Sequence, residues 1–136
     1  MPTFGRASMS RLITCDLKLQ QICFELIKDY DITVVCGVRD EAAQTEAYLA
    51  GNSESQWPES NHNTILPVKS LAIDIAPWIS GKGLMWDVRH IYFMAGRFMQ
   101  IAFDLNIPVR WGGDWDGDHY SGDQTFHDGG HFELVV

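Results

Sequence analysis

A carboxylate inside an apolar run constrains the fold of this chain more than any other feature. Residues 71–77 have the sequence Leu-Ala-Ile-Asp-Ile-Ala-Pro, which is typical of a buried β-strand, and Asp74 lies between the two isoleucines. A buried charge costs several kcal/mol unless it is paired or bound to a metal. The fold must therefore bring a partner to Asp74, and we expect this residue to be a metal ligand or a catalytic group.

The C-terminal stretch is the second feature that predicts chemistry. Residues 126–136 have the sequence Phe-His-Asp-Gly-Gly-His-Phe-Glu-Leu-Val-Val, and the part from His131 onward predicts a terminal strand. The two glycines allow a sharp turn that would bring Asp128 close to His131. A neutral imidazole is a good zinc ligand and a nearby carboxylate is a good general base. Asp-Gly-Gly is also ordinary turn chemistry, however, and a single histidine is more often structural.

The remaining periodicity predicts one α+β domain, a size that 136 residues support. Helices are predicted at residues 16–30, 39–51 and 88–105, and strands at residues 32–36, 71–77, 108–111 and 131–136. Residues 1–14 are expected to be extended. Two polar segments, 51–70 and 78–87, are expected to be loops, and a loop as long as the first is usually functional.

Composition excludes several classes of protein. Hydrophobic residues make up 46% of the chain and charged residues 21%, values that exclude a disordered or fibrous protein. A net charge of −8 argues against a nucleic-acid partner, which requires basic surface. The three cysteines are odd in number, so we expect reduced thiols rather than a fully disulfide-bonded scaffold. No segment has the length of a membrane span and the N-terminus lacks an export signature, so a cytoplasmic start is expected.

Two imidazoles and one carboxylate can be collected into a catalytic zinc set, with the fourth position left for water. The candidates are His62 in the 51–70 loop, Asp74 and His131, with Asp128 as the base. Zinc makes water acidic enough to attack at neutral pH, and the base can pass the proton to a leaving amine. Arg39, at a predicted strand-to-helix junction, could stabilise an oxyanion, although an ion pair with a neighbouring acidic residue (position 40 or 41) is an equal alternative.

Five motifs, in this order, resemble the M15 family of zinc peptidases. They are Gly37-Val-Arg39 followed by Gln44, Ser60-Asn-His62, Ala72-Ile-Asp74-Ile, Arg110-Trp-Gly-Gly-Asp-Trp115, and Asp128 followed by His131-Phe-Glu-Leu134. That family includes D-Ala-D-Ala carboxypeptidases and the L-alanyl-D-glutamate endopeptidases of bacteriophage endolysins. The resemblance extends from about residue 32 to the C-terminus, and the joint order is far more specific than any single motif.

The resemblance implies a role for each matching residue. His62, Asp74 and His131 would bind Zn²⁺, Asp128 would be the general base, and Arg39 would stabilise the developing negative charge. Ser60, Gln44 and Glu133 would support them without touching the metal. The implied fold is a small, mostly antiparallel sheet packed against two or three helices, as in the hedgehog and D-Ala-D-Ala peptidase proteins.

The function implied is that of a phage-type endolysin, a monomer that hydrolyses the L-Ala–D-Glu bond of peptidoglycan stem peptides. Asp-x-x-His, rather than Glu-x-x-His, matches that group. Such a protein would wait in the host cytoplasm and act on the wall after release. Two alternatives are a carboxypeptidase that removes terminal D-Ala and a catalytically silent, zinc-binding module that docks to the wall or the virion.

One departure from the family pattern affects the first ligand. The family spaces its histidine and aspartate by seven positions, whereas His62 and Asp74 are twelve apart and the intervening glycine is absent. The extra residues, which include Ile65-Leu-Pro67, can bulge outward at small cost, or they can form a different specificity loop. His62 is therefore the least secure ligand, and its alternatives are His90, His119 and His127.

Asp114, Asp116 and Asp118 alternate around a glycine, which resembles the first half of a calcium loop. Position 125, the twelfth of such a loop, is Thr rather than Glu, so the segment is not an EF-hand. A Ca²⁺ ion that orders this loop beside the active site is one hypothesis, and a solvated acidic turn is the other.

Overall fold

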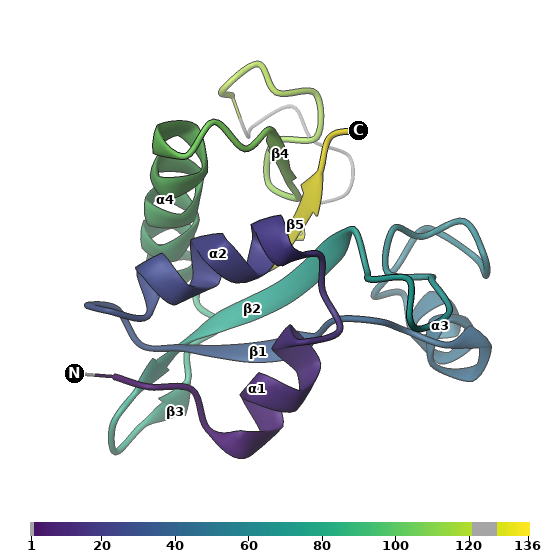
Figure 1. Ribbon diagram of the computed structural model, residues 1–136, viewed down its shortest axis with the longest axis horizontal. Helices are drawn as coiled ribbons and strands as arrows, with labels where there is room; N and C mark the ends of the chain where they lie inside the picture. Colours follow the sequence, from purple (N-terminus) through teal and green to yellow (C-terminus); the bar gives the residue numbers. More distant parts are fainter. Residues whose placement is uncertain (1, 121–127) are drawn as a thin grey trace.

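A computed structural model describes residues 2–120 and 128–136. This part of the chain forms four helices and a small antiparallel sheet, so the α+β prediction is confirmed (Figure 1). The helices are α1 (Arg6–Leu12), α2 (Leu17–Leu26), α3 (Glu41–Leu49) and α4 (Val88–Asp104). The strands are β1 (Ile32–Cys36), β2 (Ala72–Ile79), β3 (Gly83–Leu84), β4 (Val109–Trp111) and β5 (His131–Leu134).

Helix α1 corrects one prediction, because residues 1–14 were expected to be extended. The helix begins after Gly5 without a side-chain cap, and tertiary contacts hold it instead. Leu12 is fully buried, and the Ser8 hydroxyl accepts a hydrogen bond from the Val34 amide of β1 at 3.0 Å. A second correction concerns residues 78–87, where β2 continues to Ile79 and the short β3 pairs with its end.

Helices α2 and α4 form the apolar layer, and both begin where the sequence places a capping aspartate. The side chain of Asp16 accepts from the Lys18 amide, and that of Asp87 accepts from the His90 amide. Their apolar faces pack on the sheet, where the Phe98 ring of α4 stacks on Phe132 of β5 with 4.0 Å between ring centroids. No helix among the described residues is long and apolar enough to cross a membrane.

The sheet has the strand order β1-β2-β5-β4, and its register positions the polar residues. Asp74 of β2 lies opposite His131 of β5 and, on the other side, opposite Cys36 of β1, where the register shifts at a bulge. Side chains alternate between faces along a strand. Ile73 and Ile75 consequently lie in the core, while Asp74 lies on the opposite face. The fold thus places a carboxylate and an imidazole side by side on one face of the sheet.

The described cysteine thiols agree with the expectation of reduced sulfur. Cys15 and Cys23 are buried, Cys36 is half-buried, and none of the three forms a disulfide.

Candidate active site

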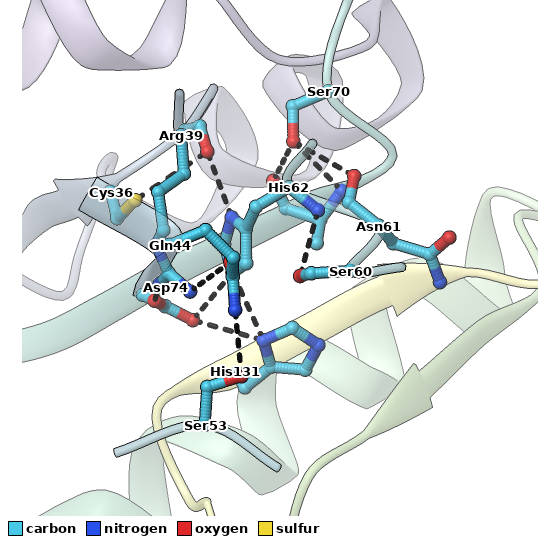
Figure 2. A network of polar contacts seen from close by, with 12 residues as sticks. Cys36, Arg39, Gln44, Ser53, Ser60, Asn61, His62, Ser70, Asp74 and His131 are labelled. Carbon is cyan, nitrogen blue, oxygen red and sulfur yellow. Dashed lines mark hydrogen bonds and ion pairs between the residues drawn. The ribbon is translucent and has the colours of Figure 1, made fainter. Parts of the chain in front are cut away.

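Three side chains from distant parts of the chain converge at the centre of the site (Figure 2). His62 Nε2 lies 3.2 Å from Asp74 Oδ1 and 3.2 Å from His131 Nδ1. His131 Nδ1 lies 3.0 Å from Asp74 Oδ1. The loop residue, the β2 residue and the β5 residue predicted as ligands are therefore brought together.

The chemistry of this donor set fits a metal ion. The other ring nitrogen of each histidine faces an acceptor, since His62 Nδ1 lies 2.8 Å from the Gly37 carbonyl and His131 Nε2 lies 2.7 Å from Glu133 Oε1. Carbonyl and carboxylate oxygens only accept, so these nitrogens carry protons, and the other two ring nitrogens face Asp74, where each can hold a proton or offer its lone pair to a metal. Two ligands that are each about 2.0 Å from a tetrahedral metal are about 3.3 Å apart, close to the spacing of the three donor atoms.

Electrostatics also favour a positive charge at this centre. Burial opposes ionisation of Asp74, but the two adjacent histidines hold the pKa of its carboxyl well below the usual range. Burial would lower the pKa of His62, but the Asp74 carboxylate outweighs it and raises that pKa to about 10. Burial likewise opposes a charge on His131, and its contacts with Asp74 and Glu133 raise its pKa to about 8. The pocket attracts a cation, either protons or a metal.

Arg39 pairs with the metal-site carboxylate rather than with its sequence neighbours. Its Nη2 donates to Asp74 Oδ2 at 3.0 Å. The side chain also lines a cavity of about 500 Å³ beside the histidines, which we call the main cavity. Asp40 instead caps α3 by accepting from the Ala43 amide. The Arg39 amide also donates to the His62 carbonyl at 2.9 Å, which ties the start of α3 to the ligand loop. The position at a strand-to-helix junction thus does direct this side chain into the site.

Gln44 is fully buried and links Arg39 to the loop that follows α3. Its Oε1 accepts from Arg39 Nη1 at 3.0 Å and from Asn63 Nδ2 at 3.1 Å. Its Nε2 donates to the Ser53 hydroxyl at 3.0 Å and to the Ser55 carbonyl at 2.6 Å. One amide therefore fixes the guanidinium and the wall of the cavity together.

Asp128 lies beside the centre, with its carboxylate within 4.8 Å of the donor atoms of Asp74 and His131. Burial and the charge of Asp74 raise the pKa of its carboxyl. The predicted turn is present: the Asp128 amide donates to the Gly112 carbonyl at 2.9 Å, and the His131 amide donates to the Asp128 carbonyl at 3.1 Å. A Cβ at Gly112 would lie 2.1 Å from the Asp128 carbonyl oxygen, so glycine is required there.

Glu133 and Ser60 contact the two histidines of the cluster. Besides accepting from His131, Glu133 accepts through Oε2 from Asn61 Nδ2 at 2.7 Å and from Arg110 Nη1 at 3.3 Å. Burial opposes its ionisation, but the contact with His131 lowers the pKa of Glu133. The Ser60 hydroxyl accepts from the His62 amide at 3.2 Å, which orients the ligand loop.

The lengthened spacing between His62 and Asp74 is absorbed by a bulge. The Leu71 amide donates to the Asn61 carbonyl at 3.1 Å, so the two ends of the extra segment lie side by side. Its apolar residues point outward, and Ile65 is 75% exposed. The alternative ligands lie elsewhere: His90 pairs with Asp87 in the first turn of α4, and the exposed His119 lies outside the cluster. His127 lies outside the described residues.

Three residues of the site were not predicted. The Cys36 thiol lies within 4.8 Å of the donor atoms of His62 and Asp74, and Asn61 holds Glu133. The Trp115 ring lies 5.3 Å from that of His131 and lines the main cavity, whose volume is about 500 Å³. Trp115 belongs to the quoted Trp-Gly-Gly-Asp-Trp segment and Cys36 directly precedes Gly37-Val-Arg39, so the motifs themselves were the available signal.

The acidic loop beside the cavity brings three carboxylates together. Oxygens of Asp114, Asp116 and Asp118 lie within 4.8 Å of one another. Asp114 Oδ1 is buried without a hydrogen-bond partner among the described residues, while Asp114 Oδ2 accepts from the His119 amide at 2.9 Å. Burial and the two neighbouring carboxylates raise the pKa of Asp114.

Comparison with known proteins gives three consistent matches. The family model described as phage L-alanyl-D-glutamate peptidase matches residues 2–135. The L-alanyl-D-glutamate peptidase of Escherichia phage T5 is 31% identical over an alignment of 137 positions that covers 97% of each chain. The crystal structure of the Serratia marcescens L-Ala D-Glu endopeptidase ChiX superimposes with a TM-score of 0.74 at 25% identity, over 97% of this chain and 89% of the other.

Proposed function

Because the chain belongs to the phage L-alanyl-D-glutamate peptidase family, we propose that it hydrolyses the L-Ala–D-Glu bond of peptidoglycan stem peptides. The observation that carries this proposal is the convergence of two imidazoles and one carboxylate beside a separate, half-buried carboxylate, Asp128. The two histidines and the proposed base, Asp128, thus line one cavity together with Arg39.

The metal in this proposal is Zn²⁺, held by His62, Asp74 and His131. Nitrogen-rich tetrahedral sites with one open position favour zinc. When bound, a zinc ion polarises the scissile carbonyl and lowers the pKa of a water molecule to about 7. Glu133 and the Gly37 carbonyl accept the distal ring protons of the two histidines, so that each ring is held in the tautomer that offers its lone pair to the centre.

Asp128 is the general base and then the general acid. Its carboxylate, within 4.8 Å of the donor atoms of Asp74 and His131, removes a proton from the attacking water. The same proton then passes to the amine nitrogen of D-Glu as the C–N bond breaks. The products are a new carboxylate on L-Ala and a free amine on D-Glu.

Arg39 stabilises the negative charge that develops on the scissile carbonyl oxygen. The Asp74 carboxylate and the Gln44 amide hold its guanidinium in a fixed orientation, which reduces the reorganisation needed during the reaction. Ser60 and Glu133 position the ligands, through the His62 amide and the His131 ring.

The alternatives are less well supported. A silent docking module has no use for a base and a cation beside its metal, and Asp128 and Arg39 are both present. Neither of the two named relatives is described as a carboxypeptidase for terminal D-Ala. All the proposed site residues come from one chain, so a monomer is competent. We propose that it acts as a lysin on the wall after release from the host cytoplasm.

Mass spectrometry of peptidoglycan digested by the zinc-loaded protein, with and without a chelator, tests the proposal. Chelator-sensitive fragments with a new D-Glu amino terminus are the expected result. Free D-Ala would support the carboxypeptidase instead. Intact peptidoglycan from several wall types, treated with protein that holds one zinc per chain, would support the docking module.

We further propose that Ca²⁺ binds Asp114, Asp116 and Asp118 and orders the loop that carries Trp115. The buried oxygen of Asp114 and the mutual repulsion of three carboxylates support a cation there. Titration of metal-stripped protein with Ca²⁺ should raise the melting temperature, and Asp116→Asn should weaken the response. A melting temperature and an activity that do not change with Ca²⁺ would show that the segment is a solvated acidic turn.

A further inference from the structure

A second cavity shares Asp128 with the main cavity. Its volume is about 210 Å³, and it is lined by Trp86, Val88, Ile91, Tyr92, Asp128 and the Gly129-Gly130 backbone. We call it the Trp86 pocket. Trp86 and Val88 are 54% and 61% exposed, so their apolar surfaces are open to a ligand. Asp128 also lines the main cavity, and the turn at residues 128–130 therefore separates two neighbouring binding spaces.

The walls of the Trp86 pocket are fixed by packing. The Tyr92 ring meets the Trp111 ring edge to face with 5.3 Å between centroids, and Trp111 Nε1 donates to the Gly129 carbonyl at 2.8 Å. A Cβ at Gly130 would lie 3.3 Å from the Trp86 ring and 2.7 Å from the Ile75 carbonyl oxygen. A side chain there would press on both walls, so glycine keeps the turn flush with the pocket. The pocket is preformed.

The two cavities differ in chemistry. The main cavity is lined by arginine, serine, asparagine and acidic side chains. In the Trp86 pocket, Asp128 is the one charged residue among the described lining residues, and the others are aromatic or aliphatic side chains and the polar backbone of Gly129 and Gly130. Charged substrate groups therefore suit the first cavity, while an uncharged group with exposed C–H bonds suits the second, because aromatic faces attract such bonds.

The stem peptide has the same asymmetry about its scissile bond. Its carboxyl side carries the D-Glu carboxylate and the charged groups of the diamino acid that follows. Its amino side carries the methyl group of L-Ala and the N-acetylated muramoyl sugar, which are uncharged because the lactyl carboxyl is bonded to L-Ala. The scissile bond joins these two sides, and Asp128, the proposed base for that bond, lines both cavities.

We propose that the Trp86 pocket binds the muramoyl end of the substrate, with the sugar packed against Trp86. This inference rests on the proposed function, since it assigns the amino side of the same scissile bond. It makes the glycan end of the substrate a specificity determinant for an enzyme that otherwise reads a peptide.

The test compares two substrates, a muramoyl tripeptide and the same tripeptide without the sugar. The zinc-loaded wild-type protein should have a higher kcat/KM for the sugar-bearing substrate, and Trp86→Ala should reduce that preference by about tenfold. Trp86→Phe should retain most of the preference. Trp78→Ala is the matched control, because Trp78 is a similarly exposed tryptophan (43%) outside this pocket, and it should leave the preference unchanged.

A binding measurement separates this inference from the proposed function. The NMR signal of the Trp86 indole N–H in the Asp128→Asn protein should shift with the muramoyl tripeptide and not with the sugar-free peptide. Two results would overturn the assignment. One is an equal loss of kcat/KM for both substrates in Trp86→Ala, and the other is an indole N–H signal that shifts equally with the two peptides or with neither. If the wild-type protein cleaves neither substrate, the proposed function fails, and the titration alone decides the pocket.

Discussion

The two faces of strands β2 and β5 are built from alternate residues and follow opposite rules. On one face, Phe132 stacks on Phe98 in a core of aliphatic and aromatic side chains. On the other face, Asp74, His131 and Glu133 are joined by contacts of 2.7–3.0 Å. Both faces of β5 are buried, so burial alone does not distinguish the core from the site.

The difference lies in how specific each contact must be. An apolar side chain is stabilised by any neighbour that fills the adjoining space, so that core contacts are partly interchangeable. A buried imidazole or carboxylate needs a partner at one particular atom, and a missing partner leaves an uncompensated group. We therefore expect replacements on the core face to change stability and replacements on the site face to change metal binding or catalysis.

The largest effect is expected at Asp128, which borders the site face and contacts the reacting atoms. Asp128→Asn removes the proton acceptor while conserving shape, and kcat should fall about 10²- to 10⁴-fold. Zinc content by atomic emission and the melting temperature should stay near those of the wild-type protein. Activity that survived with normal zinc content would show that another group is the base.

On the core face, Phe132→Ala should lower the free energy of unfolding by about 3–5 kcal/mol, because it removes a fully buried ring and leaves a cavity. Urea denaturation of the metal-stripped protein measures this loss without a contribution from metal binding. Phe103→Ala is the control: its side chain is 78% exposed, and the change should stay within about 0.5 kcal/mol. A loss below about 1 kcal/mol for Phe132→Ala would remove the distinction between the two faces.

The core face was predictable because periodicity is a local signal. The apolar run around Asp74 located β2, and the three- and four-residue steps located α4 and the start of α2, although α2 ends at Leu26, four residues before the predicted end. Helix α1 has no such signal: it lacks a side-chain cap, and it is held by contacts such as Ser8 with Val34, which exist only after β1 is in place. A seven-residue helix of this kind depends on tertiary packing.

The site was predictable only in part, because partners on the site face come from distant segments. The buried charge of Asp74 signalled that a partner must exist, but not that Arg39 would supply its second contact. Gln44 matched a motif, yet its bonds to Ser53 and Ser55 depend on how the loop after α3 folds back. The twelve-residue spacing looked unfavourable for His62, but a hydrogen bond from the Leu71 amide to the Asn61 carbonyl closes the bulge, so that His62 still lies beside Asp74.

Glu133 tests whether a supporting contact on the site face acts through the metal. Glu133→Gln keeps the volume but weakens the acceptor for His131 Nε2, and zinc affinity should fall about 10- to 100-fold. Competition with a chromogenic chelator measures this change. Arg110→Gln is the matched control, because this half-exposed partner of Glu133 is 3.3 Å away and should matter little. Equal effects of the two replacements would mean that Glu133 acts as a general structural residue.

The smallest effect is expected from a change of pH, which should alter the stability of the metal-stripped protein only through the histidines of the site face. The pKa of His62 is raised from about 6.5 in an unfolded chain to about 10, so the metal-stripped protein gains stability from the charged histidine below pH 6.5. That contribution is lost as the pH rises through about 10, and the melting temperature of the metal-stripped protein should fall over this window.

Zinc affinity should change in the opposite direction. Zinc needs the lone pair that the proton occupies, so between pH 6 and 8 the apparent association constant should rise at least about tenfold per pH unit. His131, whose pKa is raised to about 8, adds to this slope. Calorimetry in buffers of different ionisation enthalpy should show proton release on zinc binding. Phe132→Ala should lower stability equally at every pH, so a pH-dependent loss there, or pH-independent zinc binding, would show that the two faces are not separate.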